Sequence, residues 1–531
     1  MSTARSVLGV ARIVALATLL SKVFGLGREV VVAAAFGASA ITDAFSYAYV
    51  VPGFLLILLG GINGPFHSAV VSVVSKRGQG DTGEAIETLT TMVGAILLVG
   101  TVGLLVFAEP IVAFATPGFA QSADGEAIRA IAVGQFRIMA PLALLAGAIG
   151  IGFGTLNAAD MYWLPSVSPL FSSVAVMGAV GVAVWYSGGV VTDVGLGGQA
   201  LAWGVLLGAL AQWLVQLAGP GGRGMGRFRL RWDTRHPAVQ EMLRVMVPAT
   251  LSSGLLHVNV YTDLWFASFL TGNVAAALGF AQPLVQTPLG LLSNVILVPY
   301  MPLFSRLAGD GDWSGFAERL RQGLLVTAIA MLPVGALTVA LAEPVVRAIY
   351  ERAAFDREAS RLVASLLAAY GVGMFFYLAR DVVVRAYYAL GDGETPFRIS
   401  IAGIGLNALF NYLAVSRFGA PGLALATAGV NAISLGLLLF LLQRRLGPFP
   451  WRTWGQPFVL LLGFALLAGG VGYGMAQAGT QIWGDRLWVA RVATLGAGGI
   501  SGLVTFGLLT LTLRLPELTS LLQRLRRTPP P

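Results

Sequence analysis

Apolar segments long enough to cross a lipid bilayer recur along the whole chain, and short polar segments separate them. A spanning helix needs about 20 consecutive, mostly apolar residues, and fourteen segments meet this length. The pattern predicts an all-α polytopic membrane protein with about fourteen transmembrane helices. Their approximate cores are residues 8–36, 44–73, 88–108, 127–155, 163–186, 197–219, 240–268, 274–304, 318–342, 361–388, 397–416, 421–442, 456–478 and 488–513.

The first apolar segment differs from a cleavable signal peptide. It contains Lys22 and Arg28, and it has neither a clean apolar centre nor a small-residue cleavage site. We therefore expect it to be retained as the first membrane helix.

The two halves of the chain resemble each other. Residues 108–112 (AEPIV) return as residues 342–346 (AEPVV), 234 positions later, and Pro65 corresponds to Pro299 at the same offset. Each half holds six predicted helices, so the repeats should run parallel about an axis along the membrane normal. Chance similarity between apolar segments is the alternative. The predicted division is two pseudo-symmetric lobes (1–219 and 240–445), a basic linker (220–239), two additional helices (446–513) and a tail (514–531).

Composition agrees with a membrane location and excludes several enzyme classes. Charged residues make up 11% of the chain, against about 25% in soluble proteins. There are no cysteines, which excludes disulfides and thiolate chemistry. The three histidines form no metal-binding pair, and neither lysine follows a glycine as a Walker A loop requires. We expect no cofactor and no use of ATP, with membrane potential or a monovalent ion as the driving force.

Positive charge lies mainly on one predicted side of the membrane. With a cytoplasmic N-terminus and alternating helices, 21 of the 34 basic residues fall on the cytoplasmic side and 7 on the outer side. The positive-inside rule then places both termini in the cytoplasm. The outer segment 343–361 is the main exception, with four arginines interleaved with four acids. The basic stretch 220–244 is interpreted as a solvated linker. Nucleic-acid or partner binding is the alternative there, and we expect no nucleic acid.

Charged residues inside membrane segments are costly and therefore mark candidate functional sites. Lys22 and Arg28 lie in the first segment, and Asp43 begins the second. On a straight helix the two cations are about 120° apart, but Gly25 and Gly27 weaken the helix between them, so both could face one cavity. Arginine clamps a phosphate and lysine supplies a point charge, so an anion-binding site is predicted. The alternative is snorkelling plus a structural Arg28–Asp43 bridge.

The second segment contains residues 60–65 (GGINGP), a run that predicts a broken helix facing a cavity. Asn63 and His67 would present polar groups there, although a packing role is the alternative for His67. The eighth segment is similarly rich in polar and helix-breaking residues, Gln282 among them, and is predicted to form a cavity wall.

Three further charged residues are site candidates: Arg137 in the fourth segment, Asp263 in the seventh and Arg380 in the tenth. Asp381 and Arg385 are spaced four apart and are predicted to neutralise each other, which leaves Arg380 without a partner. Asp263, together with Asp43 and the two glycines of the first segment, is a candidate for gating or ion coupling.

Several motifs resemble one family of membrane proteins. Residues 21–29 (SKVFGLGRE), followed by 36–38 (FGA) and 42–45 (TDAF), resemble the start of the MurJ (MviN) family, the lipid II flippases of the MOP exporter superfamily. Residues 389–396 (ALGDGETP) resemble the segment after the tenth helix of that family, and 299–306 resemble the end of its eighth. Fourteen helices is also the family's count.

The resemblance implies a MATE-like fold and an alternating-access flippase of the bacterial inner membrane, without enzymatic activity. It implies a cationic cavity for the pyrophosphate and sugars of a lipid-linked glycan. It also implies a groove by the last two helices for the polyprenyl tail, and cell-wall synthesis proteins as further partners. Arg28 and Asp43 match essential family charges, and Lys22 replaces a family arginine. The family's arginines in its second and eighth helices have no counterpart near Leu56 or at Gln282.

Other functions remain open at this point. One is export of another lipid-linked glycan, of the O-antigen type, or of drugs by a MATE-like protein. A membrane-embedded glycosyltransferase would need a catalytic carboxylate in a large outer loop, and the acids of 343–361 all have arginines close by. A scaffold without transport would leave the intramembrane charges Lys22, Arg28 and Arg137 unexplained.

Overall fold

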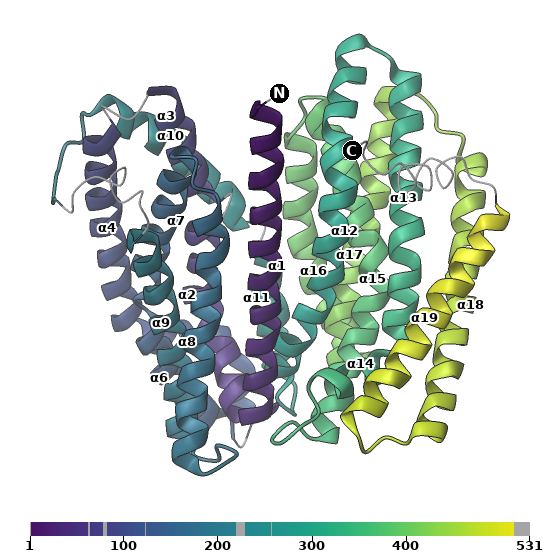
Figure 1. Cartoon of the computed structure of the whole chain (residues 1–531), viewed down its shortest axis with the longest axis horizontal. Helices are drawn as coiled ribbons and strands as arrows, with labels where there is room; N and C mark the ends of the chain where they lie inside the picture. Colours follow the sequence, from purple (N-terminus) through teal and green to yellow (C-terminus); the bar gives the residue numbers. More distant parts are fainter. Residues whose placement is uncertain are drawn as a thin grey trace. The chain divides into compact units, whose positions relative to one another are not determined.

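The computed structural model describes residues 2–61, 64–77, 82–122, 124–218, 229–255 and 258–513. Within these ranges every regular element is a helix (Figure 1), which confirms the predicted all-α class. The chain divides into two compact units. Unit 1 comprises Met1–Ala276 and Arg352–Asp356, and unit 2 comprises Ala277–Glu351 and Arg357–Pro531.

Unit 1 contains eleven α-helices, a short 3-10 helix and the first residues of a twelfth α-helix within the described ranges. They are α1 (Ser2–Phe36), α2 (Ala40–Gly60), α3 (Pro65–Arg77), α4 (Thr82–Val106), α5 (Ala108–Ala115), η1 (Pro117–Gln121), α6 (Gly125–Met139), α7 (Leu142–Ala158), α8 (Trp163–Ser187), α9 (Val194–Ala218), α10 (Pro237–Leu255), α11 (Val258–Ala267) and the start of α12 (Val274–Asp310).

Unit 2 contains the rest of α12 and seven further described helices. They are α13 (Trp313–Ala340), α14 (Ala342–Ile349), α15 (Arg357–Ala389), α16 (Glu394–Phe418), α17 (Ala420–Leu446), α18 (Trp451–Trp483) and α19 (Trp488–Thr512). The last two form an antiparallel pair that lies beside α13 (Figure 1).

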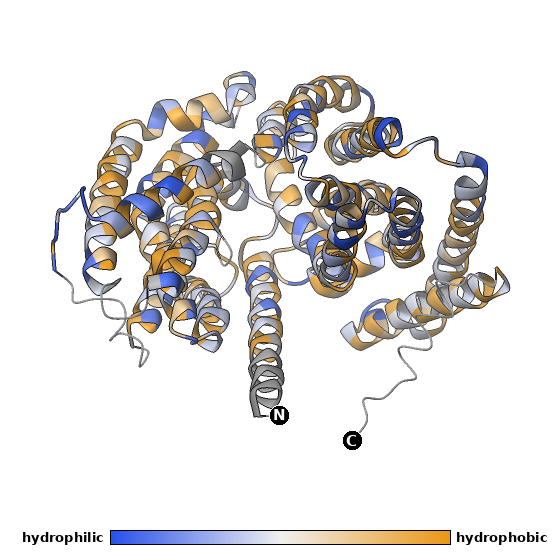
Figure 2. Ribbon diagram, turned by 90° about the horizontal axis from the view of Figure 1, so that it is seen from above, coloured by the Kyte–Doolittle hydropathy of each residue, from blue (hydrophilic) through white to orange (hydrophobic). Residues whose placement is uncertain are grey.

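The described helices include many that can cross a membrane. Eleven are long and apolar enough, or twelve if α6 and α7, bent by 41° at their junction, count as one span. Hydrophobic residues recur along all the described helices (Figure 2), and many large apolar side chains are exposed, with Trp185 82%, Ile482 74% and Val99 73% exposed. Such a surface needs lipid as its solvent. The polytopic class is thus confirmed, while the count of fourteen stays a prediction.

The apolar side chains that face inward form a separate core in each unit. In unit 1, Phe66, Leu89 and Met242 join α3, α4 and α10 around one buried cluster. In unit 2, Leu325 and Phe506 join α13 and α19, with α18 between them. Both cores consist of aliphatic and aromatic side chains.

The predicted break in the second membrane segment is present. α2 ends at Gly60, Gly61 after it has extended backbone, and α3 begins at Pro65; glycine is unfavourable in the interior of a helix, which agrees with the end of α2 here. α12 behaves differently, since it continues through Pro283, Pro288, Pro299 and Pro302 without interruption. The helix-breaking composition of the eighth segment therefore did not break it.

The internal repeat is visible in two short helices. α5 begins at Ala108 and α14 at Ala342, 234 positions apart, and each is eight residues long. Each follows a long apolar helix, α4 or α13, after a single residue. The proline of each copy lies in the first turn, where a helix tolerates it. This agreement supports two related repeats, while the predicted boundaries at 219 and 240 stay a prediction.

The turn between α1 and α2 depends on one glycine. Gly37 has φ +64°, a conformation that glycine adopts without strain. The N–H of Ala354 donates a hydrogen bond of 3.1 Å to the carbonyl of Ala34. As a result, a Cβ on Gly37 would collide with the carbonyl oxygen of Ala354. Residues 352–356 thus fold as part of unit 1.

Replacing Gly37 with alanine should destabilise the protein. The left-handed backbone alone costs an alanine about 1–2 kcal/mol, and the collision with Ala354 adds to this. Gly100→Ala, in the middle of α4 with no atom near the added methyl group, is the control and should be neutral or stabilising by about 0.5–1 kcal/mol. Thermal unfolding of the purified protein measures both effects. Equal melting temperatures for Gly37→Ala and wild type would contradict the close approach seen here.

Candidate functional site

The cations of α1 lie on one unbroken helix. α1 continues through Gly25 and Gly27, and a Cβ on either glycine would meet no atom within 4 Å. Lys22 is exposed. The Arg28 side chain is 35% exposed, and its Nε donates to Glu29 Oε1 over 3.1 Å. The predicted flexible point at the glycines is therefore not a break in this structure, and the two cations keep the angular separation of a regular helix.

Asp43 is buried near the start of α2, with 3% of its surface exposed. Its Oδ1 accepts a hydrogen bond of 3.0 Å from the backbone N–H of Ala276. Ala276 is the third residue of α12, so the carboxylate lies at the positive end of that helix, where a negative charge is stabilised. The predicted alternative of a structural Arg28–Asp43 bridge is wrong for this structure, because Arg28 pairs with Glu29.

A second polar link joins the same parts of the chain. Asn273, with φ +57°, donates from Nδ2 to the carbonyl of Ala38 over 3.0 Å. Together with the Asp43–Ala276 bond and the Ala354–Ala34 bond, it ties three segments that sequence topology places on the outer face. Within unit 1, the turn after α1, the start of α12 and residues 352–356 are thus held together by backbone-directed hydrogen bonds.

The polar residues of the broken second segment are only partly described. Asn63 lies outside the described residues. His67 is 7% exposed in the first turn of α3, and its Nε2 lies 2.7 Å from the side-chain nitrogen of Asn157 on α7. The ring joins two helices of unit 1 through this contact. The geometry favours the packing role that was the alternative for His67.

The remaining candidates lie on different helices. Arg137 on α6 and Gln282 on α12 are exposed, whereas Asp263 on α11 is 8% exposed. Arg380 on α15 donates to the hydroxyl of Ser400 on α16 over 2.7 Å. Arg28, Asp43 and His67 each contact a neighbour outside the predicted set, so the structure does not assemble these residues into one bonded cluster.

The predicted pairing on α15 needs correction. Among the ion pairs of the described residues, Asp381 pairs with Arg380, at 3.7 Å, rather than with Arg385 one turn away. The hydroxyl of Ser400 supplies the second contact of Arg380. Two residues four apart on a helix can form an ion pair, but this spacing does not determine which neighbouring cation an acid binds. The hydrogen bond to the Ser400 hydroxyl on α16 favours the position of Arg380 beside Asp381.

One motif of the resemblance has a clear structural role. Asp392, between α15 and α16, accepts hydrogen bonds from the N–H and hydroxyl of Thr395 at 2.9 and 2.7 Å and pairs with Arg445 at 2.6 Å. Burial would raise the pKa of Asp392, but these contacts hold it below its usual range. The residue links the start of α16 to the end of α17, so it serves the fold of unit 2.

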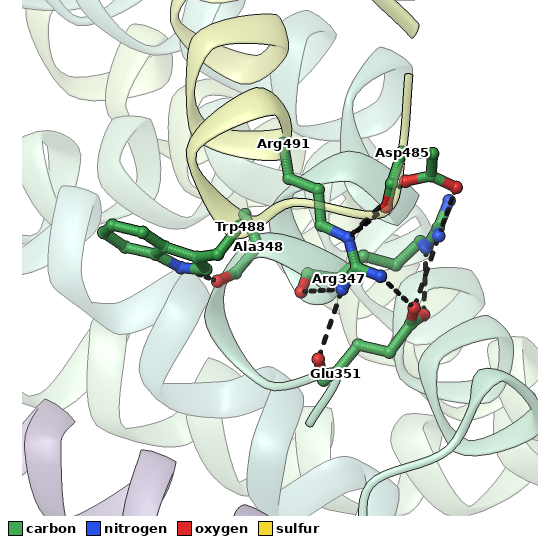
Figure 3. A network of polar contacts seen from close by, with 6 residues as sticks. All are labelled: Arg347, Ala348, Glu351, Asp485, Trp488 and Arg491. Atoms are coloured by element: carbon green, nitrogen blue, oxygen red, sulfur yellow. Dashed lines mark hydrogen bonds and ion pairs between the residues drawn. The ribbon is translucent and has the colours of Figure 1, made fainter. Parts of the chain in front are cut away.

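Residues 343–361 take part in an ion-pair network that sequence reasoning did not foresee (Figure 3). Arg347 and Arg491 both bind Glu351, at 2.9 and 3.0 Å, and both reach Asp485 in the turn between α18 and α19. Trp488 adds a hydrogen bond of 3.0 Å from its indole N–H to the carbonyl of Ala348. Glu351, one of the acids that a glycosyltransferase could use, is thus engaged with two arginines at this end of unit 2.

Several other polar residues that form contacts between helices were missed by the sequence analysis. The contact of Asn157 with His67 joins residues 90 positions apart, so no local pattern indicates it. Asn407 and Asn411, both fully buried on α16, form a side-chain hydrogen bond of 3.1 Å, and Asn407 also bonds Thr427 on α17. Asparagines at i and i+4 in an apolar helix were the available signal for this interhelical contact.

Comparison with known sequences gives one consistent result. A family model described as lipid II flippase MurJ matches residues 32–493. The chain is similar to the probable lipid II flippase MurJ of Synechocystis sp., with 47% identity over 526 residues that cover 98% of each chain. It is also similar to the lipid II flippase MurJ of Burkholderia cenocepacia, with 32% identity over 463 residues that cover 86% of this chain and 87% of the relative.

Comparison with solved structures identifies the fold. The chain is similar to a lipid II flippase MurJ in an inward closed conformation, with TM-score 0.75 and 21% identity, covering 94% of this chain and 99% of the other. It is also similar to an inward-facing multidrug resistance MATE family transporter of the MOP superfamily, with TM-score 0.63 and 14% identity, covering 82% and 98%. At these identities the likeness shows the fold alone, which is the predicted MOP-type fold.

Proposed function

The chain belongs to the MurJ family of lipid II flippases, and from this membership we propose that it moves lipid II from the inner to the outer leaflet by alternating access. The observation that carries the proposal is the family match over residues 32–493. As a member of this family the protein is a transporter, not an enzyme, and a multi-pass protein of the bacterial inner membrane. Its substrate is a lipid-linked glycan within the bilayer.

The alternatives from the sequence are not favoured. Both curated relatives are lipid II flippases by name, while the likeness to a MATE transporter rests on 14% identity and concerns the fold. No observation therefore specifically supports export of an O-antigen-type glycolipid or of drugs. None specifically supports a glycosyltransferase activity either.

We assign the pyrophosphate of the substrate to the cations of α1. Arg28 can give two parallel hydrogen bonds to phosphate oxygens, and Lys22 adds a point charge six residues away. Arg28 pairs with Glu29 in this structure, so an incoming phosphate would exchange one anionic partner for another. Asp43, at the N-terminus of α12, would serve as a latch that is made and broken as the carrier resets.

Complementation of a bacterium depleted of its own lipid II flippase tests the proposal. The protein should restore growth and also the exposure of lipid II at the outer face, which a labelled extracellular probe reports. Growth without lipid II exposure, at normal membrane levels of the protein, would contradict the assignment and point to another lipid-linked glycan.

Both chain ends are expected in the cytoplasm. The reason is the 21 to 7 distribution of basic residues, since positively charged loops resist translocation. Reporter fusions at Arg5 and at Thr528 should both give a cytoplasmic signal, while a fusion in the turn at Gly484 should give an outer signal. An outer location for either terminus would overturn this topology.

A further inference from the structure

A cavity opens in unit 2 among α14, α15, α18 and α19, whereas the α1 cations belong to unit 1. It has a volume of about 560 Å³, and its charged lining residues are Glu343, Arg347, Arg357, Arg361, Asp485 and Arg491. By the sequence topology it lies at the outer end of these helices, where residues 343–361 depart from the positive-inside pattern. Neither the lipid II site proposed above nor the helix core accounts for this cavity.

The charges that line the cavity do not cancel. Arg347 and Arg491 are occupied by Glu351 and Asp485 (Figure 3). That leaves two arginines of α15, one helical turn apart on the same face, for which the described part of the chain shows no ion pair: Arg357 and Arg361. Glu343 is the one remaining acid of the lining. Two arginines without ion pairs against one remaining acid leave an excess of positive charge, which makes the cavity a site for an anion.

A hydroxyl inside the cavity also lacks a partner. Thr494, on α19, is 2% exposed, and its Oγ1 forms no hydrogen bond with the described residues. A buried hydroxyl normally finds a partner, because leaving it unsatisfied costs about 1–3 kcal/mol. Since Thr494 lines the cavity, a ligand with acceptor oxygens would satisfy it. Gln477 and Thr480 of α18 place further polar groups on the same wall.

The surroundings of the cavity are those of a membrane–water interface. Tyr473, Trp483 and Trp488 on α18 and α19 are 53%, 49% and 58% exposed, and aromatic side chains of this kind gather at headgroup level. Ile482 and Val489, 74% and 69% exposed, lie on the same two helix ends. The anionic group of a ligand bound here would therefore lie among arginines, and the apolar chains of the ligand would lie beside the exposed apolar side chains.

We propose that this cavity binds the phosphate group of an anionic lipid headgroup through Arg357, Arg361 and Thr494. Arginine offers paired donors that match phosphate oxygens, and Thr494 of α19 supplies a short hydroxyl donor. The exposed aromatic and aliphatic side chains beside the opening favour a lipid over free phosphate. This inference does not depend on the identity of the transported substrate.

The test uses the full-length protein purified in detergent and titrated with phosphatidylglycerol, with phosphatidylcholine as the zwitterionic reference, under native mass spectrometry. The double variant Arg357→Gln with Arg361→Gln should bind phosphatidylglycerol at least about tenfold more weakly. Thr494→Val should weaken it about threefold or more without lowering the melting temperature, because the hydroxyl has no partner to lose. The control is Arg417→Gln with Arg486→Gln, which removes two exposed arginines outside the cavity lining and should bind as wild type does.

A second arm separates the sources of phosphate. Inorganic phosphate alone is titrated into the lipid-depleted protein by calorimetry. Weak or absent binding, with tight phosphatidylglycerol binding, supports the lipid assignment. A different result would overturn the lipid assignment: the wild type binds inorganic phosphate, the Arg357/Arg361 double variant does not, and the wild type shows no preference for phosphatidylglycerol over phosphatidylcholine. Equal phosphatidylglycerol binding by wild type and double variant would overturn the site itself.

Discussion

Arg28→Ala is expected to abolish lipid II export while the protein still inserts into the membrane at wild-type levels. The side chain lies on α1, which the sequence predicts as the first membrane helix; it is 35% exposed and has Glu29 as its partner, so it is not needed to hold two helices together. Placing a cation inside a membrane costs a few kcal/mol of free energy, so a cation at such a position is expected to serve a function. Losing two charge-assisted hydrogen bonds to a phosphate should lower transport about 100-fold or more.

Arg28→Lys separates charge from geometry. It should recover part of the activity if charge alone is needed, and little if the planar two-donor group is needed. Glu29→Gln is the matched control, because it removes the partner of Arg28 and leaves the cation in place, so it should keep most of the transport. Export is measured as lipid II exposure per unit of protein in the membrane. Normal complementation by Arg28→Ala at equal protein levels would remove this residue from the site.

Collapse of the membrane potential is expected to slow lipid II export strongly. The sequence has no Walker A motif, and the cargo carries a pyrophosphate, hence about two negative charges. A bacterial membrane is negative inside, so outward movement of an anion runs downhill by about 2.3 kcal/mol per charge per 100 mV. Two uncompensated charges gain roughly 4–5 kcal/mol. The gain falls if Lys22 and Arg28 move with the headgroup or if cations accompany it.

Separate collapse of the potential and of the pH gradient, in proteoliposomes or whole cells, measures the two contributions. Potential-driven export should fall when potassium with valinomycin removes the voltage and persist when nigericin removes the pH gradient. Flipping that is unchanged without the potential and tracks the pH gradient alone would refute the electrical mechanism. It would favour proton antiport through Asp43 or Asp263, both buried in unit 1.

Much of the fold could be predicted from local pattern. The long apolar segments predicted the helices, and the run at residues 60–65 predicted the break between α2 and α3. The repeated AEPIV and AEPVV motifs predicted an internal repeat, and the structure shows that each copy begins a short helix, α5 or α14. These features depend on residues within one or two helical turns of each other. Helix length, glycine content and motif spacing are properties that the sequence displays directly.

The partners of the polar side chains could not be predicted in the same way. Arg28 was expected to face a phosphate or Asp43, and it pairs with Glu29, while Asp43 binds the N-terminus of α12 at Ala276. Arg380 was expected to be unpaired, and it binds Ser400 and Asp381. A polar group in an apolar environment takes whichever donor or acceptor comes within about 3 Å, and several candidates lie within reach of each long side chain.

The sequence by itself determined that this is a helical membrane transporter with a broken second segment and an internal repeat, and it indicated the family, because hydropathy and local motifs carry that information. Only the tertiary structure decided that Asp43 meets α12, 233 residues away, and that Arg347 and Glu351 meet Asp485 and Arg491 across the turn of the last helix pair. It alone shows Arg357, Arg361 and Thr494 around one cavity. The physical reason is that ion pairs and cavities form between surfaces brought together by packing, and the packing of helices depends on the shapes of many side chains at once.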